Sequence, residues 1–277
     1  MNDLEYKYLR RMILKFVDID IDLYKSKQMR RRLGYLVDGS KAGSVVAFCH
    51  HLEDDPELVR KLKDFLTINV SEFFRDHQHF TNLKTTILPE LLRSSPRLNI
   101  WSAGCSNGAE VYSIAMILDE LAPRRRHRFL ATDIDESILD LAREGGPYTP
   151  RETRNVGKWH AQRFFRTTPE GHWVIDDIKK KVQFKEQNIL QDPFESGFDL
   201  IVCRNVIIYF SNDVRHKLFA SFKQSLRSGG ILFVGGSEVI IGDNGLGLID
   251  VLPCFYRKSD PAASRTKQRE SGARPRQ

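Results

Sequence analysis

The sequence predicts an all-α N-terminal domain followed by an α/β domain into which a small antiparallel β-subdomain is inserted. Apolar residues recur at helical spacing through residues 3–68, and no strand pattern interrupts them. From residue 98 onward, short apolar strands alternate with amphipathic helices, which is typical of a parallel sheet with helices on both faces. Between residues 148 and 184 this alternation stops, and strand-like segments surround a Pro-Glu-Gly turn.

The helical domain is predicted over residues 1–68. Three apolar stripes at helical spacing define its helices: Leu9, Ile13, Phe16 and Val17; Met29, Leu33, Leu36 and Val37; and Leu58, Leu62, Phe65 and Leu66. Residues 69–95 connect this domain to the next one and contain a further helix around residues 80–92.

The α/β domain is predicted over residues 96–258. Its strands are expected at LNIWSA, RFLAT, FDLIVCR and GGILFVGG, and its helices at AEVYSIAMILDEL, ESILDLAREG and RHKLFASFKQSL. The insertion, residues 148–184, holds RFFRTTPEGHWVI and KKKVQF, which we interpret as short antiparallel strands. Residues 259–277 are basic and rich in Ser, Ala, Gly and Pro, and we expect them to be disordered.

Composition narrows the class of protein. The chain is 41% hydrophobic and 29% charged, as expected for a soluble core, and no apolar run is long enough to span a membrane. The N-terminus lacks the apolar segment of an export signal. Part of the net charge of +7 lies in the last residues, so nucleic-acid binding is not required, whereas an acidic partner is compatible. The four cysteines form no C-x-x-C pair, which favours a reducing cytoplasm over disulfides or zinc: Cys49, Cys105, Cys203 and Cys254.

The segment NIWSAGCSNGAEVYSIAM places Gly104 and Gly108 between a strand and a helix, at the sheet edge where ligands bind in such folds. The G-x-x-x-G spacing matches neither the dinucleotide fingerprint nor the ATP-binding loop. Glu110, in the first helical turn, favours a cationic ligand group, and Asp133 and Asp135 end the next strand, where a carboxylate commonly binds ribose. S-adenosylmethionine fits this site, because it has an adenosine whose ribose can meet a carboxylate, a positively charged sulfonium and no phosphate. The alternative is a tight turn whose glycines serve packing alone.

Two other motifs place polar residues near this edge. In FDLIVCRNVIIYF, Arg204 and Asn205 follow a strand, and we expect them against the ligand with Tyr209 over the reacting group. The alternative is a strand followed by an apolar turn. In LTINVSEFFRDHQHF, the polar residues either contact the ligand or cap a helix. The H-x-H of this motif has no further ligands nearby, so no metal site is expected.

Five segments in order resemble the chemotaxis receptor methyltransferases, the CheR family: TINVSEFFRD, WSAGCSNGAEVYSIAM, ATDID, VCRNVIIYF and GGILFVGGSE. The resemblance covers residues 3–258. It implies an N-terminal helical domain and an S-adenosylmethionine-binding α/β domain with an inserted β-subdomain. It also implies methylation of glutamate side chains on the cytoplasmic helices of chemoreceptors. We expect a monomeric enzyme located in the cytoplasm, without insertion into a membrane.

The resemblance also assigns residues to roles. In addition to Gly104, the resemblance implies the following cofactor contacts: Asn69, Ser71 (where Thr is common in the family), Arg75, Glu110, Asp133, Asn188, Ile189, Arg204 and Asn205. Arg75 and Tyr209 match the two residues suspected of assisting catalysis. In the family, a basic helix docks on the acidic receptor helices, and its residues here are Lys27, Arg30, Arg31 and Arg32. The alternative for this helix is a solvated basic face.

The expected reaction needs no general base, because a glutamate side chain is already ionised at neutral pH. Positioning and exclusion of water would then carry catalysis. Two other functions stay open, a methyltransferase of nucleic acids or small molecules and a module that binds S-adenosylmethionine without turnover. Only Thr167 to Gly171 link the strands of the insertion, so we expect no dependence on a receptor tail peptide added as a further strand.

Overall fold

The computed structural model describes residues 1–240 and 246–259, and the chain folds into two compact units. The first unit comprises Met1–Asn69 and Ile208–His216, and the second comprises Val70–Ile207 and the chain from Lys217 onward. The sequence places residues 208–216 in the α/β domain, whereas in the structure they pack with the N-terminal helices. The segment predicted to be disordered, residues 259–277, lies outside the described residues except for Ser259.

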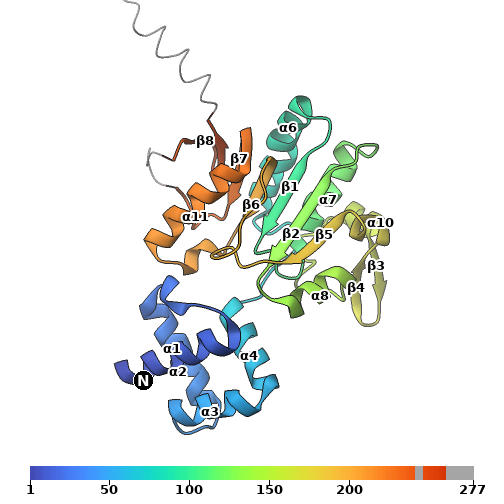
Figure 1. Ribbon diagram of the computed structural model, residues 1–277. Coiled ribbons are helices and arrows are strands. Elements are labelled where there is room, and N and C mark those ends of the chain that lie inside the picture. The colour runs from blue at the N-terminus through green and yellow to red at the C-terminus, as the bar shows by residue number, and fades with distance from the viewer. Residues whose placement is uncertain (241–245, 260–277) are drawn as a thin grey trace, which may run out of the picture. The chain divides into compact units, whose positions relative to one another are not determined.

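The first unit is helical, as the apolar stripes predict (Figure 1, blue). Its helices are α1 (Asp3–Val17), η1 (Ile21–Leu23), α2 (Ser26–Gly39), α3 (Val45–Asp54) and α4 (Pro56–Thr67). Asn2 and Glu5 form a capping box that starts α1, and Asp55 caps α4 ahead of Pro56 at its first turn. The predicted stripes become a shared core, in which Leu9, Ile13, Leu33, Phe48 and Leu62 are fully buried.

The predicted helix around residues 80–92 is longer than expected and has an irregular centre. It consists of α5 (His77–Asn82), a π-helical turn η2 (Leu83–Ile87) and α6 (Leu88–Ser94). Pro89 has no N–H to donate to the carbonyl of Thr85, one turn earlier, and this missing bond explains why the helix widens here.

The second unit is built on a seven-stranded sheet with the order β5-β2-β1-β6-β7-β9-β8. Five neighbouring strands are parallel: β5 (Val182–Glu186), β2 (Arg128–Asp133), β1 (Asn99–Ala103), β6 (Phe198–Cys203) and β7 (Leu226–Val234). The strand β9 (Phe255–Lys258) lies antiparallel between β7 and β8 (Leu248–Leu252). The predicted α/β fold is therefore confirmed, with a reversed strand near one edge that the sequence did not reveal.

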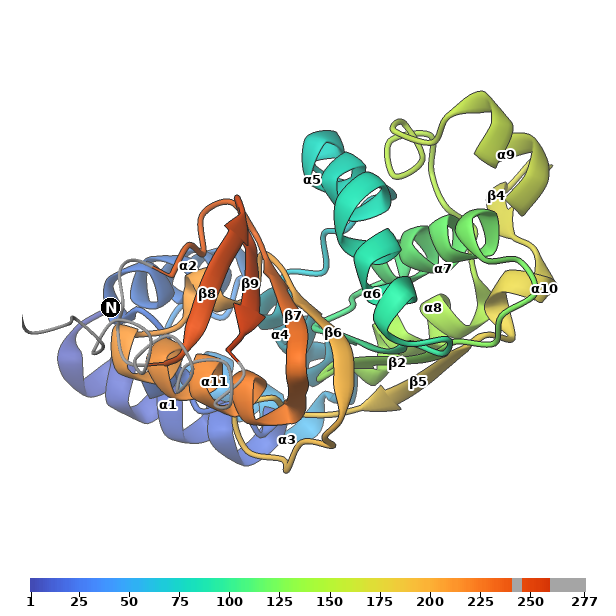
Figure 2. The ribbon, with the colours of Figure 1, turned by 90° about the horizontal axis from the view of Figure 1, so that it is seen from above.

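The strand order of the sheet reverses at β1. The chain adds β2 and β5 on one side of β1, and later adds β6 and β7 on the other side. Helices α6, α7 (Ala109–Leu121) and α8 (Glu136–Glu144) cover one face, and α11 (Asn212–Ser225) covers the other (Figure 2). A reversal of this kind opens a crevice at the carboxyl ends of the central strands, which is where ligands bind in open α/β sheets.

The inserted β-subdomain is smaller than predicted. Strands β3 (Phe165–Thr168) and β4 (Gly171–Val174) pair as an antiparallel hairpin, as expected. The segment KKKVQF was wrongly assigned to this insertion, because it forms β5 and pairs parallel to β2 in the main sheet. Its Phe184 ring meets the Tyr112 ring of α7 edge-on at 5.7 Å, so burial against the main domain decides its partner.

At Gly104, directly after β1, there is no room for a side chain, because the segment that follows β6 lies close by. Its φ is +74°, and a Cβ built there would lie 2.5 Å from Cγ2 of Val206. Gly197 has a φ of +83° with open space around it, so it shares only the backbone requirement. We expect Gly197→Ala to lower the free energy of unfolding by roughly 1–2 kcal/mol, and Gly104→Ala to lower it by about 1–3 kcal/mol more through overpacking. Urea unfolding measures both, and equal losses would contradict the steric argument.

Candidate functional site

The glycine loop after β1 is held against the end of β2 by backbone hydrogen bonds. The N–H groups of Gly104 and Cys105 both donate to the carbonyl oxygen of Thr132, at 2.8 and 2.9 Å. The Ser106 N–H donates to a carboxylate oxygen of Asp133 at 2.8 Å. The loop is thus fixed in one conformation at the carboxyl edge of the sheet.

The start of α7 needs a second glycine for a different reason. Gly108 caps the helix with a φ of +82°, and a Cβ there would lie 3.1 Å from both Ala142 and Tyr112. The neighbouring Asn107 accepts the Ala109 N–H on its side-chain oxygen at 3.2 Å. Both glycines of the G-x-x-x-G pattern are therefore required by a left-handed backbone and by close neighbours.

Two buried carboxylates flank this loop. Glu110 accepts a hydrogen bond from the Ser102 hydroxyl at 2.7 Å, and burial raises its pKa above the usual range, although the nearby Arg204 opposes the rise. Asp133 accepts the N–H groups of Ser106 and Asp135, and burial likewise raises its pKa. Carboxylates short of solvent favour a cationic group or hydroxyl donors as ligands.

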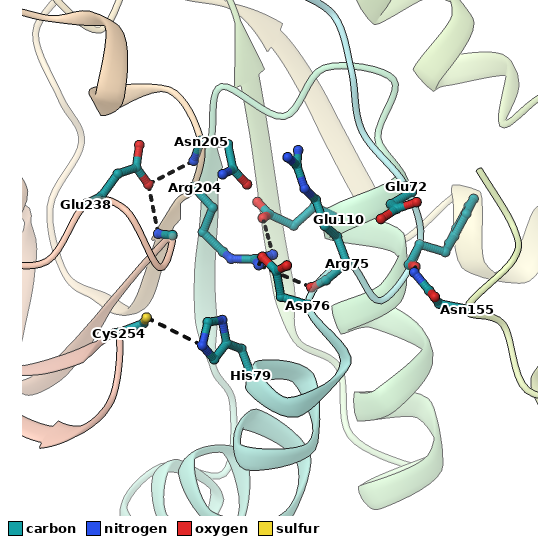
Figure 3. Close-up of polar contacts among 12 residues, drawn as sticks. Glu72, Arg75, Asp76, His79, Glu110, Asn155, Arg204, Asn205, Glu238 and Cys254 are labelled. Atoms are coloured by element: carbon teal, nitrogen blue, oxygen red, sulfur yellow. Dashed lines mark hydrogen bonds and ion pairs between the residues drawn. The ribbon is translucent and has the colours of Figure 1, made fainter. Parts of the chain in front are cut away.

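Arg204 connects three segments at the centre of the site (Figure 3). Its guanidinium donates to Glu110 at 3.3 Å, to Asp76 at 2.6 Å and to the backbone carbonyl of Arg75 at 3.1 Å. The side chain is 1% exposed and lies over the ring of Phe233 at 4.7 Å. Arg204 therefore orients Glu110, and any contact of Arg204 with a ligand in this arrangement would come from its backbone.

The segment before α5 carries the predicted residues Ser71 and Arg75. The Phe74 N–H donates to the hydroxyl of Ser113 in α7 at 3.0 Å, which ties the segment to the helix after the glycine loop. The Arg75 side chain is partly exposed and donates to the carbonyl of Val70 at 3.2 Å. The segment is thus anchored on α7, and Arg75 keeps further N–H donors for a ligand.

The turn after β5 brings Asn188 and Ile189 to the end of β2. The Gln187 N–H donates to the carbonyl of Asp133 at 2.8 Å. The side-chain oxygen of Asn188 accepts the Leu190 N–H at 3.0 Å, which stabilises the turn. The structure thus joins Asn188 and Ile189 to the same sheet edge as the glycine loop.

Glu238 is a residue of this edge to which the sequence interpretation gave no role. It is fully buried, and one carboxylate oxygen accepts the N–H groups of Asn205 and Gly235, both at 2.8 Å (Figure 3). Asn205 has a φ of +62°, so its backbone is held in the left-handed region by this carboxylate. The available signal was a glutamate shortly after a buried strand, preceded by two glycines and a serine, in GGILFVGGSE.

The remaining predicted residues lie in the helical unit. Asn69 ends its first segment, and Tyr209 belongs to Ile208–His216. In α2, Arg30 pairs with Asp3 at 2.6 Å and lies over the Tyr6 ring.

The other three basic residues of α2 differ in their surroundings. Arg32 is partly buried, donates to the carbonyl of Phe65 and lies over its ring. Lys27 and Arg31 are exposed. The basic face predicted from the sequence therefore contains two structural arginines and two free to meet a partner.

The described part of the chain was searched for membrane-spanning helices and for metal sites. No helix there is long and apolar enough to cross a bilayer. No group of three or more His, Cys, Asp or Glu side chains there could hold a metal ion.

Comparison with known proteins identifies both units. Residues 4–67 match the model of the CheR methyltransferase all-alpha domain, and residues 69–247 match the CheR methyltransferase SAM binding domain. The chain belongs to the CheR methyltransferase family. It is 36% identical to a chemotaxis protein methyltransferase of Listeria monocytogenes over 256 residues, covering 92% of this chain and 97% of that protein. A chemotaxis protein methyltransferase of Borreliella burgdorferi is 33% identical over 269 residues, covering 92% and 94%.

This CheR protein is thus an S-adenosylmethionine-dependent methyltransferase of the chemotaxis type, and its sheet edge fits that cofactor. Gly104 and Gly108 allow the close turn of the loop at this edge, where a Cβ would meet neighbouring side chains. Asp133 offers a buried acceptor for hydroxyl groups, and Glu110 a buried anion for a positively charged group. The individual contacts predicted from the sequence stay predictions.

The raised pKa of Glu110 has a consequence for binding at low pH. Glu110 takes up its proton at a higher pH than an ordinary glutamate, so acidification removes the anion that would face the cationic cofactor. We expect the affinity for S-adenosylmethionine to fall as the pH is lowered through the raised pKa of Glu110, and to fall less in Glu110→Gln. Calorimetric titration of both proteins measures this. Identical pH dependence in the two proteins would exclude Glu110 as the cause.

Glu238 should influence the affinity for the cofactor indirectly, because it holds the backbone of Asn205, a predicted cofactor contact. Glu238→Ala leaves the Asn205 and Gly235 N–H groups without their acceptor, at roughly 1–3 kcal/mol each in stability. We expect Glu238→Gln to retain the fold and to weaken S-adenosylmethionine binding several-fold, because its neutral amide oxygen holds Asn205 less firmly. Glu170→Gln, in the exposed hairpin turn, is the matched control. Unchanged calorimetric affinity in Glu238→Gln would separate this residue from the site.

Proposed function

We propose that this protein transfers the methyl group of S-adenosylmethionine to glutamate side chains on the cytoplasmic helices of chemoreceptors, forming glutamyl methyl esters for sensory adaptation. The observation that carries the proposal is the match of both family domains along residues 4–247. The similar proteins of Listeria and Borreliella are named chemotaxis protein methyltransferases, which supports chemoreceptors as the partner. The exposed cations of α2 support an acidic protein substrate.

The chemistry asks little of the protein beyond binding and orientation. When bound, S-adenosylmethionine supplies a sulfonium methyl group that a carboxylate oxygen can attack, while the carbon–sulfur electron pair leaves with S-adenosylhomocysteine. Because the substrate glutamate is already ionised near neutral pH, no side chain has to remove a proton. Catalysis then depends on alignment of the reactants and exclusion of water.

The chain's own residues divide this work. Glu110 and Asp133 would bind the cofactor, and Arg204 holds Glu110 in place. Arg75, with N–H donors to spare, would hold the substrate carboxylate by hydrogen bonds. Such bonds orient a carboxylate while leaving a lone pair free to attack.

The proposal is tested by incubating the protein with S-adenosylmethionine and cytoplasmic fragments of chemoreceptors, followed by mass spectrometry of the fragments. We expect added methyl groups on glutamates, removed by mild alkali as for esters, and their loss in Glu110→Gln. RNA and small carboxylic acids form parallel arms of the same experiment. Methylation of RNA or of a small acid, with unmodified receptors, would overturn the assignment.

The β3–β4 hairpin supports independence from a receptor tail peptide. Only Pro169 and Glu170 separate the two strands. The outer edge of β4 is already occupied, because Tyr148 and His172 exchange two backbone hydrogen bonds of 2.8 and 2.9 Å. An added peptide strand therefore meets one edge of a very short hairpin.

We expect a pentapeptide from a receptor C-terminus to show no micromolar binding in calorimetry. Receptors lacking their last residues should be methylated at the same rate as intact ones. Arg166→Glu, on β3, should leave this rate unchanged. A large drop on removal of the tail would show that β3 accepts a peptide strand despite the short turn.

A further inference from the structure

A pocket in the second unit is lined by one face of α5 and η2 (defined here as the α5 pocket). Its volume is about 370 Å³, which lies within the range of small-molecule sites. The lining residues of this helix have the spacing of a single helical face: His77, Phe80, Thr81, Lys84 and Thr85. The other walls come from the segment before α5, from α7, and from α9 (Lys158–Phe164) with the loop that precedes it: Phe74, Ile117, Asn155, Gly157 and His160.

The apolar part of the α5 pocket is largely aromatic. The Phe74 ring meets the Phe80 ring edge-on at 5.6 Å, and it lies 5.1 Å from the His160 ring. Phe74, Phe80 and Ile117 are buried, so their positions are set by the core of the unit. Rings at such distances pack well against a further planar ring, which can meet them edge-on or offset.

The walls of the α5 pocket are fixed to one another by polar contacts. Glu120 of α7 pairs with Lys84 of η2 at 2.6 Å, and its other carboxylate oxygen lies 3.4 Å from Nε2 of His160 in α9. The side-chain amide of Asn155 donates to the carbonyl of Phe73 at 3.4 Å. Three separate elements are thus joined around the pocket, so its shape is a property of the tertiary structure.

The α5 pocket offers a charged ligand little compensation. Lys84 already has a counter-ion in Glu120. Burial lowers the pKa of His160, although Glu120 opposes this shift, so the ring is uncharged at neutral pH. Among the described residues, no carboxylate lines the pocket. An ion entering it would lose its hydration without gaining an unpaired charge from Lys84 or His160.

The polar groups of the pocket favour a ligand with an N–H donor and an acceptor. The hydroxyl of Thr81 donates to the His77 carbonyl at 3.0 Å, and that of Thr85 donates to the Thr81 carbonyl at 2.9 Å. Each hydroxyl therefore uses its one proton on the helix and keeps oxygen lone pairs for a ligand. The Lys84 ammonium has three N–H groups, more than its single contact with Glu120 needs.

We propose that the α5 pocket binds the planar ring of a small, uncharged nitrogen heteroaromatic compound. The aromatic wall packs against the ring, the threonine hydroxyls accept its N–H, and Lys84 or Asn155 donates to a ring nitrogen. Among the described residues that line the pocket, none is a predicted contact of S-adenosylmethionine. The α5 pocket is therefore a second binding site in this unit, distinct from the cofactor edge.

The test uses the full-length protein with S-adenosylhomocysteine saturating the cofactor site, so that a probe cannot bind there. The probes are 7-azaindole, which is an uncharged bicyclic ring with one N–H and one acceptor nitrogen, and indene, which has the same shape without either. Indole-6-carboxylate serves as an anionic arm. We expect 7-azaindole to bind about tenfold more tightly than indene, as for two hydrogen bonds between neutral groups, and more tightly than the anion.

Variants and intermolecular nuclear Overhauser effects locate the ring. Thr81→Val keeps the shape of the side chain and removes the acceptor, so we expect it to weaken 7-azaindole binding about threefold or more and to leave indene unaffected. Thr86→Val is the matched control, because Thr86 is exposed on the same helix and does not line the pocket. It should keep the affinity within about twofold, as for an ordinary surface substitution. In the unmodified protein, protons of the probe ring should show Overhauser effects to the methyl groups of Ile117.

Equal affinity for 7-azaindole and indene, or no Overhauser effect to Ile117, would overturn the proposal. Equal losses in Thr81→Val and Thr86→Val would place the ring outside the pocket. Tighter binding of indole-6-carboxylate would show that Lys84 selects an anion, which contradicts an uncharged ligand. None of these results depends on which substrate the protein methylates, so this proposal and the receptor assignment succeed or fail separately.

Discussion

The site depends on the burial of one positive charge. Moving a guanidinium out of water is costly unless partners compensate for it, and Arg204 has Glu110, Asp76 and a backbone carbonyl as partners. These partners come from the first turn of α7 and from the segment before α5, while Arg204 itself follows β6. Removing Glu110 or Asp76 would leave the buried guanidinium with one carboxylate partner fewer, so the three chain segments are energetically coupled. The orientation of Glu110 is thus a property of the whole edge.

The same edge holds its backbone in unusual conformations. Phe74, Ser106 and Asn205 all have positive φ values, between 51° and 62°, although none is glycine. In each case a side chain from another element accepts that residue's N–H, namely the hydroxyl of Ser113, the carboxylate of Asp133 and the carboxylate of Glu238. Strained residues persist where the surroundings over-determine them. Here polar side chains supply that determination, and one of them, Asp133, is also a predicted cofactor contact.

Much of this could be predicted from local sequence pattern. The alternation of strands and helices gave the parallel core and the loop of Gly104, because these signals are set by periodicity and by turn residues. The partner of β5 could not be predicted, because Val182 to Glu186 is too short to show which strand it will pair with. The burial of Arg204 and the role of Glu238 could not be predicted from the sequence for another reason. Both are defined by contacts between segments far apart in the chain, as when Arg204 meets Asp76.

The helical unit shows a further limit of interpreting a chain in linear segments. The sequence suggests that Tyr209 belongs to the α/β domain, since it follows a strand of that domain. The Tyr209 carbonyl instead accepts the Lys25 N–H, and the nearby Ser211 N–H donates to the Leu23 carbonyl. Tyr209 therefore forms part of the unit that carries the basic helix. Asn205 and Tyr209 are only four positions apart in the chain but belong to different units. Each end of this short stretch is held within its own unit, because Glu238 accepts the Asn205 N–H and the Lys25 N–H donates to the Tyr209 carbonyl.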